Sequence, residues 1–216
     1  MLKIDELNGV YDFTDKVIGT LNRRFVTLFN RLKSLNPNNE KDVISEVTKV
    51  YEEADRITRE YLLLIATRTY REVCRSINCE DWIEDMSVIW LMEILDGYDP
   101  VTKYVYTHEV DRKRARLIEA IISSNDTAKE VENAKRLWAK QARQYADNVT
   151  DRAMVKVYKD NNIEYVVWQT EQDEKVCAEC VRRNNVRYIR EEVPPKPHYG
   201  CRCWLIPYGE ITADRS

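Results

Sequence analysis

The sequence contains little glycine and almost no histidine. Only five glycines and two histidines occur among 216 residues, and no apolar run is long enough to span a membrane. Scarce glycine favours long uninterrupted helices, because glycine weakens a helix interior more than any residue except proline. Two histidines also leave no paired-histidine zinc-protease motif, since His108-Glu109 begins like one but Arg112 occupies the place of the second histidine.

The sequence also lacks a surplus of basic residues. Charged residues make up 33% of the chain, but the net charge is −3, whereas proteins that bind nucleic acid without sequence preference are usually basic. Two local basic runs, 112–116 and 135–136, are candidate contacts for the phosphates of DNA. A solvated helix face whose cations pair with nearby acids is the favoured interpretation of both runs.

Signatures of catalysis and export are absent as well. The sequence has no dinucleotide fingerprint, no phosphate-binding glycine loop and no nucleophile elbow. The first residues lack the apolar region of a signal peptide, so we expect synthesis in the cytosol, where thiols stay reduced. We therefore expect no enzymatic activity and no membrane segment. Cys74 and Cys79, close to a helix, are expected to be small buried hydrophobes.

The first three quarters of the chain show helical periodicity. Apolar residues recur every three or four positions, as in a helix with one buried face. Asn39 is placed to cap the second helix, and Thr127 with Glu130 reads as a capping box for the fifth. The predicted helices span residues 12–35, 40–78, 81–95, 101–123 and 127–159.

The period changes after residue 162. Residues 163–169, 186–190 and 202–206 favour three short strands, the last of them ended by Pro207, which predict a small antiparallel meander. The expected fold class is α+β. A long-helix N-terminal domain (1–162) is followed by a small zinc-stabilised antiparallel β module (163–208) and a frayed tail (209–216).

Two short cysteine and histidine clusters lie in the β module. Cys177-Ala-Glu-Cys180 is one knuckle, and His198-Tyr-Gly-Cys201-Arg-Cys203 follows after a loop. Two such clusters separated by a loop are typical of a tetrahedral zinc site. A module of this size has too small a core to hold itself together, and metal binding supplies the missing folding free energy. A reduced buried pair of cysteines and a disulfide are the alternatives.

The same stretch resembles the C-terminal module of the phage Mu F-like minor head proteins, the head-morphogenesis family of tailed bacteriophages. The resemblance covers about the last fifth of the chain, where order and spacing follow the family pattern. One departure is Asn184-Asn185, which stands where the family carries a glycine turn; asparagine tolerates the positive φ of such a turn. The residues that carry the resemblance are Trp168, Thr170, Asp173, Cys177, Cys180, Tyr188, Pro194, Pro195, His198, Cys201, Arg202 and Cys203.

The resemblance implies a minor head (capsid) protein of a tailed bacteriophage or prophage. Such a protein joins the virion in few copies near the portal, assists head morphogenesis and in some cases affects DNA packaging or ejection. Its partners would be the portal protein and other head proteins, with packaged DNA as a further candidate. The competing hypothesis is a zinc-dependent nucleic-acid-binding protein, and a nuclease or toxin ranks third because four protein ligands leave zinc no open position.

The zinc ligands are expected among five residues, one more than a tetrahedral structural site requires. Cys177, Cys180, His198 and Cys201 are the preferred set, with Cys203 as the competing fourth ligand. Gly200 allows the chain to turn so that His198 and Cys201 face one ion. The tryptophans at 168 and 204 are expected in the core of the module. Asp173 and Arg202 are expected to support the knuckles by hydrogen bonding.

Overall fold

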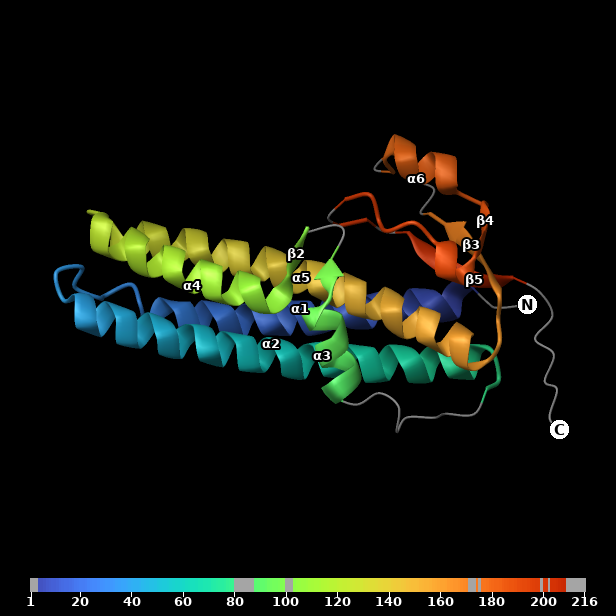
Figure 1. Cartoon of the computed structure of the whole chain (residues 1–216), viewed down its shortest axis with the longest axis horizontal. Coiled ribbons are helices and arrows are strands. Elements are labelled where there is room, and N and C mark those ends of the chain that lie inside the picture. Colours follow the sequence, from blue (N-terminus) through green and yellow to red (C-terminus); the bar gives the residue numbers. More distant parts are fainter. Residues whose placement is uncertain are drawn as a thin grey trace.

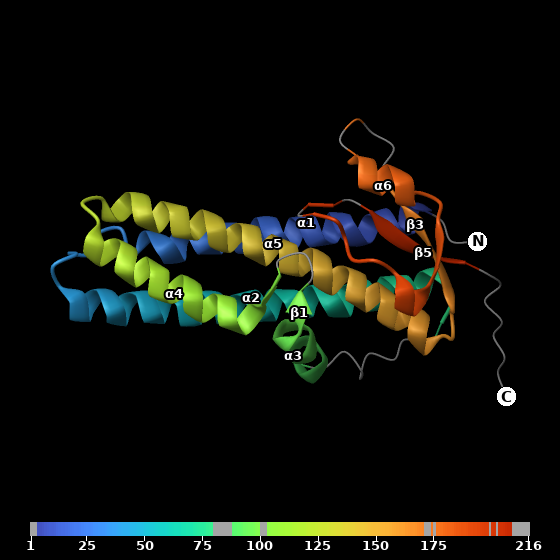
Figure 2. The ribbon, with the colours of Figure 1, turned by 45° about the horizontal axis from the view of Figure 1, so that its top comes forward.

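The computed structural model of the chain describes residues 4–79, 88–99, 103–170, 174, 176–198, 200, 201 and 203–208, with side chains from residue 9 onward. Four long helices form an elongated bundle (Figure 1). They are α1 (Ile4–Asn30), α2 (Glu40–Ser76), α4 (Tyr106–Ser123) and α5 (Thr127–Asp160). A small β module follows α5 and lies at one end of the bundle (Figure 2). The predicted α+β class, with long helices before a small antiparallel sheet, is confirmed.

An aromatic cluster joins three helices at the centre of the bundle. The ring of Trp138 on α5 meets Phe25 of α1 edge to face at 6.3 Å and Tyr51 of α2 at 5.1 Å. Phe29 of α1 extends the cluster to Tyr51 at 5.7 Å. All four side chains are almost completely buried. Burial stabilises each by roughly 1.5–3 kcal/mol, and favourable ring geometry adds about 1 kcal/mol per pair.

The first helix lies earlier in the chain than predicted. Its apolar stripe extends back through the buried Val10, and its last turn tightens into short-range bonds such as Arg31 N–H to Leu28 O. Pro37 only sets an outer limit for the helix, because a proline disfavours helical backbone at the residue before it, and residues 31–34 already form turns. Helix α2 is continuous and begins as predicted, with Asn39 Oδ1 accepting from Asp42 N–H.

A hairpin replaces the predicted start of the fourth helix. Strand β1 (Tyr98–Asp99) pairs with β2 (Tyr104–Val105), and α4 begins only after β2. Lys103 has a φ of +63°, which a right-handed helix excludes. The short helix α3 (Val88–Asp96) precedes the hairpin, and the earlier part of the predicted 81–95 helix lies outside the described residues.

The N-cap of α5 is Asp126 rather than Thr127. The Asp126 carboxylate accepts from Lys129 N–H at 3.0 Å, and its own backbone N–H donates to Ser124 Oγ. A carboxylate caps a helix start well because it also favours the positive end of the helix dipole. The capping box predicted from Thr127 and Glu130 is therefore replaced by a single cap one residue earlier, because Lys129, three residues after Asp126, has no acceptor to complete a box.

The sheet of the β module has its first strand in the middle. Strand β3 (Tyr165–Gln169) pairs with β4 (Arg187–Ile189) on one side and with β5 (Trp204–Tyr208) on the other, both antiparallel. The order β4-β3-β5 is not the predicted meander, and β5 runs through Pro207 instead of ending before it. An edge strand tolerates proline because its outer side needs no backbone N–H donor. A short helix, α6 (Ala178–Arg183), and a 3-10 turn, η2 (Arg190–Glu192), complete the module.

Cys74 and Cys79 are joined by a disulfide, so the prediction of two reduced buried thiols is wrong. Asn78 adopts a φ of +55° just beyond α2 and folds the chain back, and Cys79 N–H donates to Cys74 O at 2.9 Å. This turn brings the two Cα atoms within 4.9 Å, inside the range that a disulfide spans. The bridge therefore closes the C-terminal end of α2.

Candidate metal centre

The first knuckle is built around the start of α6. Cys177 is the N-cap of this helix, and its Sγ accepts from Cys180 N–H at 3.4 Å. The helical turn that follows places Cys180 Sγ only 3.3 Å from Cys177 Sγ. The C-x-x-C spacing thus produces two sulfur atoms on one side of a single turn, as the sequence predicts.

Two asparagines turn the chain from α6 into β4. Asn185 adopts a φ of +62°, and its N–H donates to Trp168 O at 2.8 Å. The Asn184 side chain accepts from Thr170 N–H at 3.1 Å. Asparagine therefore supplies the positive φ expected from glycine at this turn. Both residues also fix the knuckle to the end of β3.

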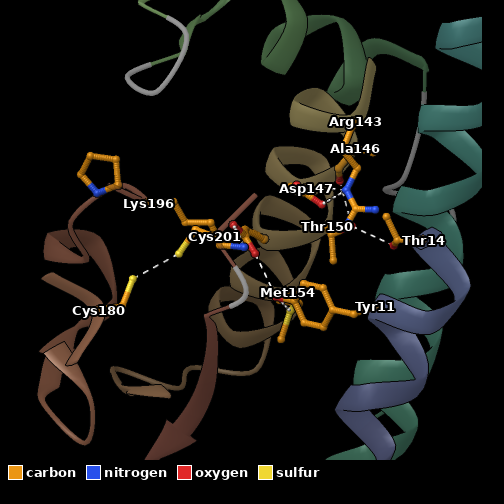
Figure 3. A network of polar contacts seen from close by, with 12 residues as sticks. Tyr11, Thr14, Arg143, Ala146, Asp147, Thr150, Met154, Cys180, Lys196 and Cys201 are labelled. Atoms are coloured by element: carbon orange, nitrogen blue, oxygen red, sulfur yellow. Dashed lines mark hydrogen bonds and ion pairs between the residues drawn. The ribbon is translucent and has the colours of Figure 1, made fainter. Parts of the chain in front are cut away.

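The second knuckle lies in the loop that leads into β5. Gly200 has a φ of +69°, a conformation that side chains rarely adopt, so the chain turns here as predicted. The turn places Cys201 Sγ 3.5 Å from Cys180 Sγ (Figure 3). The two knuckles therefore meet at Cys180.

All five predicted ligand residues gather around Cys180. The donor atoms of Cys177, Cys180 and His198 lie within 4.8 Å of one another, and those of Cys180, Cys201 and Cys203 do so too. Ligands around a tetrahedral zinc stand about 3.8 Å apart when each Zn–S bond is about 2.3 Å. The cluster has the size and the nitrogen and sulfur donors that a metal ion requires, so it could bind one. Cys203 is buried yet within the cluster, so burial does not exclude it as a ligand.

Hydrogen bonds hold part of the cluster as thiolate. The Cys201 thiol donates to Cys203 and lowers the pKa of Cys203 to about 5, against burial, with help from Thr170 and Trp168. Donation and burial raise the pKa of Cys201 itself. For Cys177, burial raises the pKa, but the backbone N–H and side chain of Cys180 outweigh it and lower the pKa to about 7. A metal binds thiolate rather than thiol, so these donors prepare the site.

Cys180 carries its proton in the metal-free cluster. Burial, together with the hydrogen bonds to Cys203 and Cys177, raises the pKa of Cys180 to about 12. A metal ion bound by Cys180 would displace that proton, because a metal binds the thiolate and not the thiol. Metal binding at this site would therefore release a proton.

Aromatic side chains surround the knuckles as predicted. Trp168 is 3% exposed, meets the ring of Tyr188 at 6.4 Å and is covered by the Arg183 guanidinium at 5.0 Å. Trp204 is 9% exposed. Both tryptophans thus belong to the module core. The other two predicted supporting residues, Asp173 and Arg202, lie outside the described residues.

The loop that leads into β5 and carries the second knuckle is called the metal loop. It is attached to the bundle by residues that the sequence did not single out. Lys196 Nζ lies 2.9 Å from Asp151 Oδ2 on α5 and 5.4 Å from the centre of the Tyr11 ring on α1. Tyr11 Oη donates to Asp151 Oδ1 at 3.0 Å, and Arg143 pairs with Asp147 one turn away (Figure 3). The network links α1, α5 and the loop before His198. The only sequence signal for it was a lysine between two prolines, Pro195 and Pro197.

Backbone contacts fix the sheet of the β module to the last turns of α5. Tyr158 Oη donates to Leu205 O at 2.9 Å, and Arg190 Nη1 donates to Tyr158 O at 3.3 Å. Tyr158 is completely buried in this contact. The β module is therefore packed on α5 along its strands as well as through Lys196.

The zinc-protease-like start at His108 is structural. Glu109 is buried and pairs with Arg112 Nη2 at 2.6 Å, and the Arg112 guanidinium covers the Tyr104 ring. His108 itself is exposed. The contact between Arg112 and the Tyr104 ring ties α4 to the preceding hairpin.

Comparison with known proteins finds no matching family model, no matching curated protein and no matching solved structure. Among the helices of the described residues, none combines the length and the apolar character needed to cross a membrane.

Proposed function

We propose that the cysteine and histidine cluster binds one Zn²⁺ ion with a structural role. Cys177, Cys180 and Cys201 supply three ligands, and His198 or Cys203 supplies the fourth. The donor set supports zinc, because thiolates with imidazole are its usual structural ligands. Four protein ligands leave no position for substrate, so the proposed site is structural, and we expect no enzymatic activity from it.

We further propose that the protein is a minor head protein of a tailed bacteriophage or prophage. The single observation that carries this proposal is the order Trp168, Cys177, Cys180, then His198, Cys201 and Cys203, which resembles the Mu F-like head-morphogenesis module. These residues converge on one cluster, which supports reading them as a module rather than as scattered matches. The protein would be made in the host cytoplasm and would reside in the virion near the portal, assisting head morphogenesis.

The helical region, residues 1–162, is the proposed contact with the portal or another head protein. The bundle is elongated and offers long faces, whereas the β module uses its small interior for the cluster and for packing on α5 (Figure 1). Leu64 on α2 and Leu137 on α5 are 49% and 52% exposed, so apolar surface is available on these faces.

Co-purification with the portal protein tests this assignment. The full chain should bind the portal and enter procapsids, and Leu64→Glu or Leu137→Glu should weaken that binding. The matched control is Val181→Glu on α6, which is 59% exposed in the β module and should bind normally. Loss of binding only in the Val181 variant would place the contact on the β module instead.

The competing assignment, zinc-dependent nucleic-acid binding, predicts a different result. The purified chain would then bind duplex DNA without the portal, with an affinity that falls steeply as salt rises. DNA binding of that kind, together with exclusion from procapsids, would reject the head-protein assignment in favour of this one.

A further inference from the structure

The four cysteines of the metal cluster differ in their exposure to solvent. Cys180, Cys201 and Cys203 are 2%, 5% and 2% exposed, whereas Cys177 is only half-buried. The reactivity of a cysteine toward a dissolved oxidant depends on access to its sulfur. An oxidant that approaches the folded chain therefore meets Cys177 before the other three.

The sulfur of Cys177 has one other sulfur close to it. Cys177 Sγ lies 3.3 Å from Cys180 Sγ, and the third donor of this group is the His198 imidazole. Cys201 and Cys203 form a group with Cys180 but not with Cys177. Both cysteines of the first knuckle belong to a single helical turn. A bond of about 2.0 Å between them thus requires side-chain rotation and no movement of the second knuckle.

Cys180 and Cys201 are the competing pair, with their sulfur atoms 3.5 Å apart. A bridge between them would join the two knuckles covalently. Both side chains are buried, however, so neither sulfur is accessible for the first reaction with a dissolved oxidant. The accessible thiol and its nearest sulfur therefore favour the pair Cys177 and Cys180.

The chain already contains one oxidised pair of cysteines. Cys74 and Cys79 are joined by a disulfide at the end of α2. Thiols that the fold brings together in this chain are therefore open to oxidation. The four cysteines of the cluster are free, although their sulfur atoms are also close together.

We propose that Cys177 and Cys180 form a reversible disulfide and that this bond and the metal ion exclude each other. The oxidant is a small disulfide such as oxidised glutathione. The Cys177 sulfur attacks one glutathione sulfur, the bond between the two glutathione sulfurs breaks, and one glutathione leaves as a thiolate. The Cys180 sulfur then attacks the Cys177 sulfur, and the second glutathione leaves as a thiolate.

Electrons and protons balance in this exchange. The two cysteine sulfurs lose two electrons, and the two glutathione sulfurs gain them. The leaving thiolates take up the protons of the cysteine thiols, or protons from water where the cysteines are already thiolates. A reducing thiol reverses both steps and restores the two cysteines.

The disulfide would remove the sulfur on which the whole cluster depends. Both groups of candidate ligands contain Cys180, and one of them contains Cys177 as well. The contacts that dock the module, Lys196 with Asp151 and Tyr158 with Leu205 O, use none of these sulfurs. Oxidation therefore empties the metal site without breaking those contacts. The exclusion of metal rests on the zinc site proposed above, whereas the disulfide itself does not.

The experiment treats the full zinc-loaded chain with oxidised glutathione. Zinc release is followed with a chelating dye, and quenched samples are alkylated and digested with trypsin. The tryptic peptide 176–182 contains Cys177 and Cys180 and no other cysteine. A bridge therefore appears as this peptide without alkylation and lighter by two hydrogen atoms. One zinc ion should leave for each bridge formed, and dithiothreitol followed by fresh zinc should restore the loaded chain.

Two controls accompany this measurement. Reduced glutathione at the same thiol concentration binds zinc but oxidises nothing, so it should leave the zinc in place and form no bridge. Brief alkylation of the zinc-loaded chain with N-ethylmaleimide should modify Cys177 at least about five-fold faster than Cys201, because only Cys177 is accessible. In denaturant the two cysteines should react at similar rates.

The proposal is overturned if oxidised glutathione first joins Cys180 to Cys201, or if zinc leaves while peptide 176–182 stays reduced. It is also overturned if that peptide of the folded chain remains reduced after long exposure to excess oxidised glutathione. Zinc that stays bound with no bridge rejects this inference alone. A chain that purifies without zinc rejects the proposed metal site, and peptide 176–182 then still tests the disulfide.

Discussion

Lys196 Nζ lies 2.9 Å from Asp151 Oδ2, and this contact joins the metal loop to the helical bundle. The two side chains are 10% and 25% exposed, so the pair is largely removed from water. Tyr11 donates to the same carboxylate from α1. Two residues after Lys196 stands His198, so this ion pair helps to hold the second knuckle near the first.

Replacing Lys196 by Met should destabilise the whole protein. Asp151 would remain mostly buried without its cation, which should cost about 2 kcal/mol after allowance for its partial exposure. Denaturant unfolding of the metal-loaded protein measures this loss. The control is Arg182→Gln, which breaks the exposed pair with Glu179 and should cost less than about 1 kcal/mol.

The double variant Lys196→Met with Asp151→Asn sharpens that test. Removing both charges should recover part of the lost stability, because no unpaired charge stays buried and the asparagine oxygen still accepts from Tyr11. Equal destabilisation in Lys196→Met and Arg182→Gln would show that the contact does not anchor the loop.

Asp147 should make the protein less stable as the pH rises from about 4 to 7. Burial raises the pKa of this carboxyl from 3.8 to about 6, although Arg143 opposes the effect. A raised pKa means that the folded state binds the proton more tightly, so the contribution is present below pH 3.8 and is lost above pH 6. The difference corresponds to roughly 3 kcal/mol.

Unfolding of Asp147→Asn beside the native chain measures that effect. The variant should gain stability relative to the native protein between pH 4 and pH 7, and the shared metal cluster cancels in the difference. Glu52→Gln, at an exposed position on α2, gives the background. A constant difference across this pH interval would mean that Asp147 is not buried as described.

The number of reactive thiols should reveal the disulfide between Cys74 and Cys79. After metal removal and denaturation without a reductant, four thiols should react, and six should react after reduction. Cys79→Ser should lower stability by about 2 kcal/mol, the entropy that a bridge over five residues removes from the unfolded chain. Six reactive thiols before reduction would contradict the bridge.

Local patterns allowed much of the fold and the cluster to be predicted. The spacing Cys177-x-x-Cys180 places two thiols on one turn whatever surrounds it, and Gly200 turns the chain because few other residues tolerate its φ. The helices followed from apolar periodicity in the same way. Their ends shifted where a local conformation decided the matter, as the positive φ of Lys103 does before α4.

Contacts between distant segments could not be predicted from the sequence. Lys196 and Asp151 are charged residues in separate segments, and nothing in either segment shows that docking buries both. Strand β3 is central because β5 pairs with the edge of β3 that β4 leaves open. The residue pattern of a strand does not say which neighbour it will pair with. The bridge at Cys74 depends on the turn at Asn78, and the expectation of a reducing compartment argued against it.

The metal content of the purified chain tests the central claim most directly. Native mass spectrometry should find one zinc ion per chain. Cys180→Ser should abolish binding because both ligand groups share this sulfur, and Cys177→Ser and Cys201→Ser should release zinc and unfold the module. Comparing His198→Ala with Cys203→Ser identifies the fourth ligand. The variant that lacks the true ligand should lose zinc more readily than the other. Folded protein without metal, or with a Cys180–Cys201 disulfide, would contradict the account.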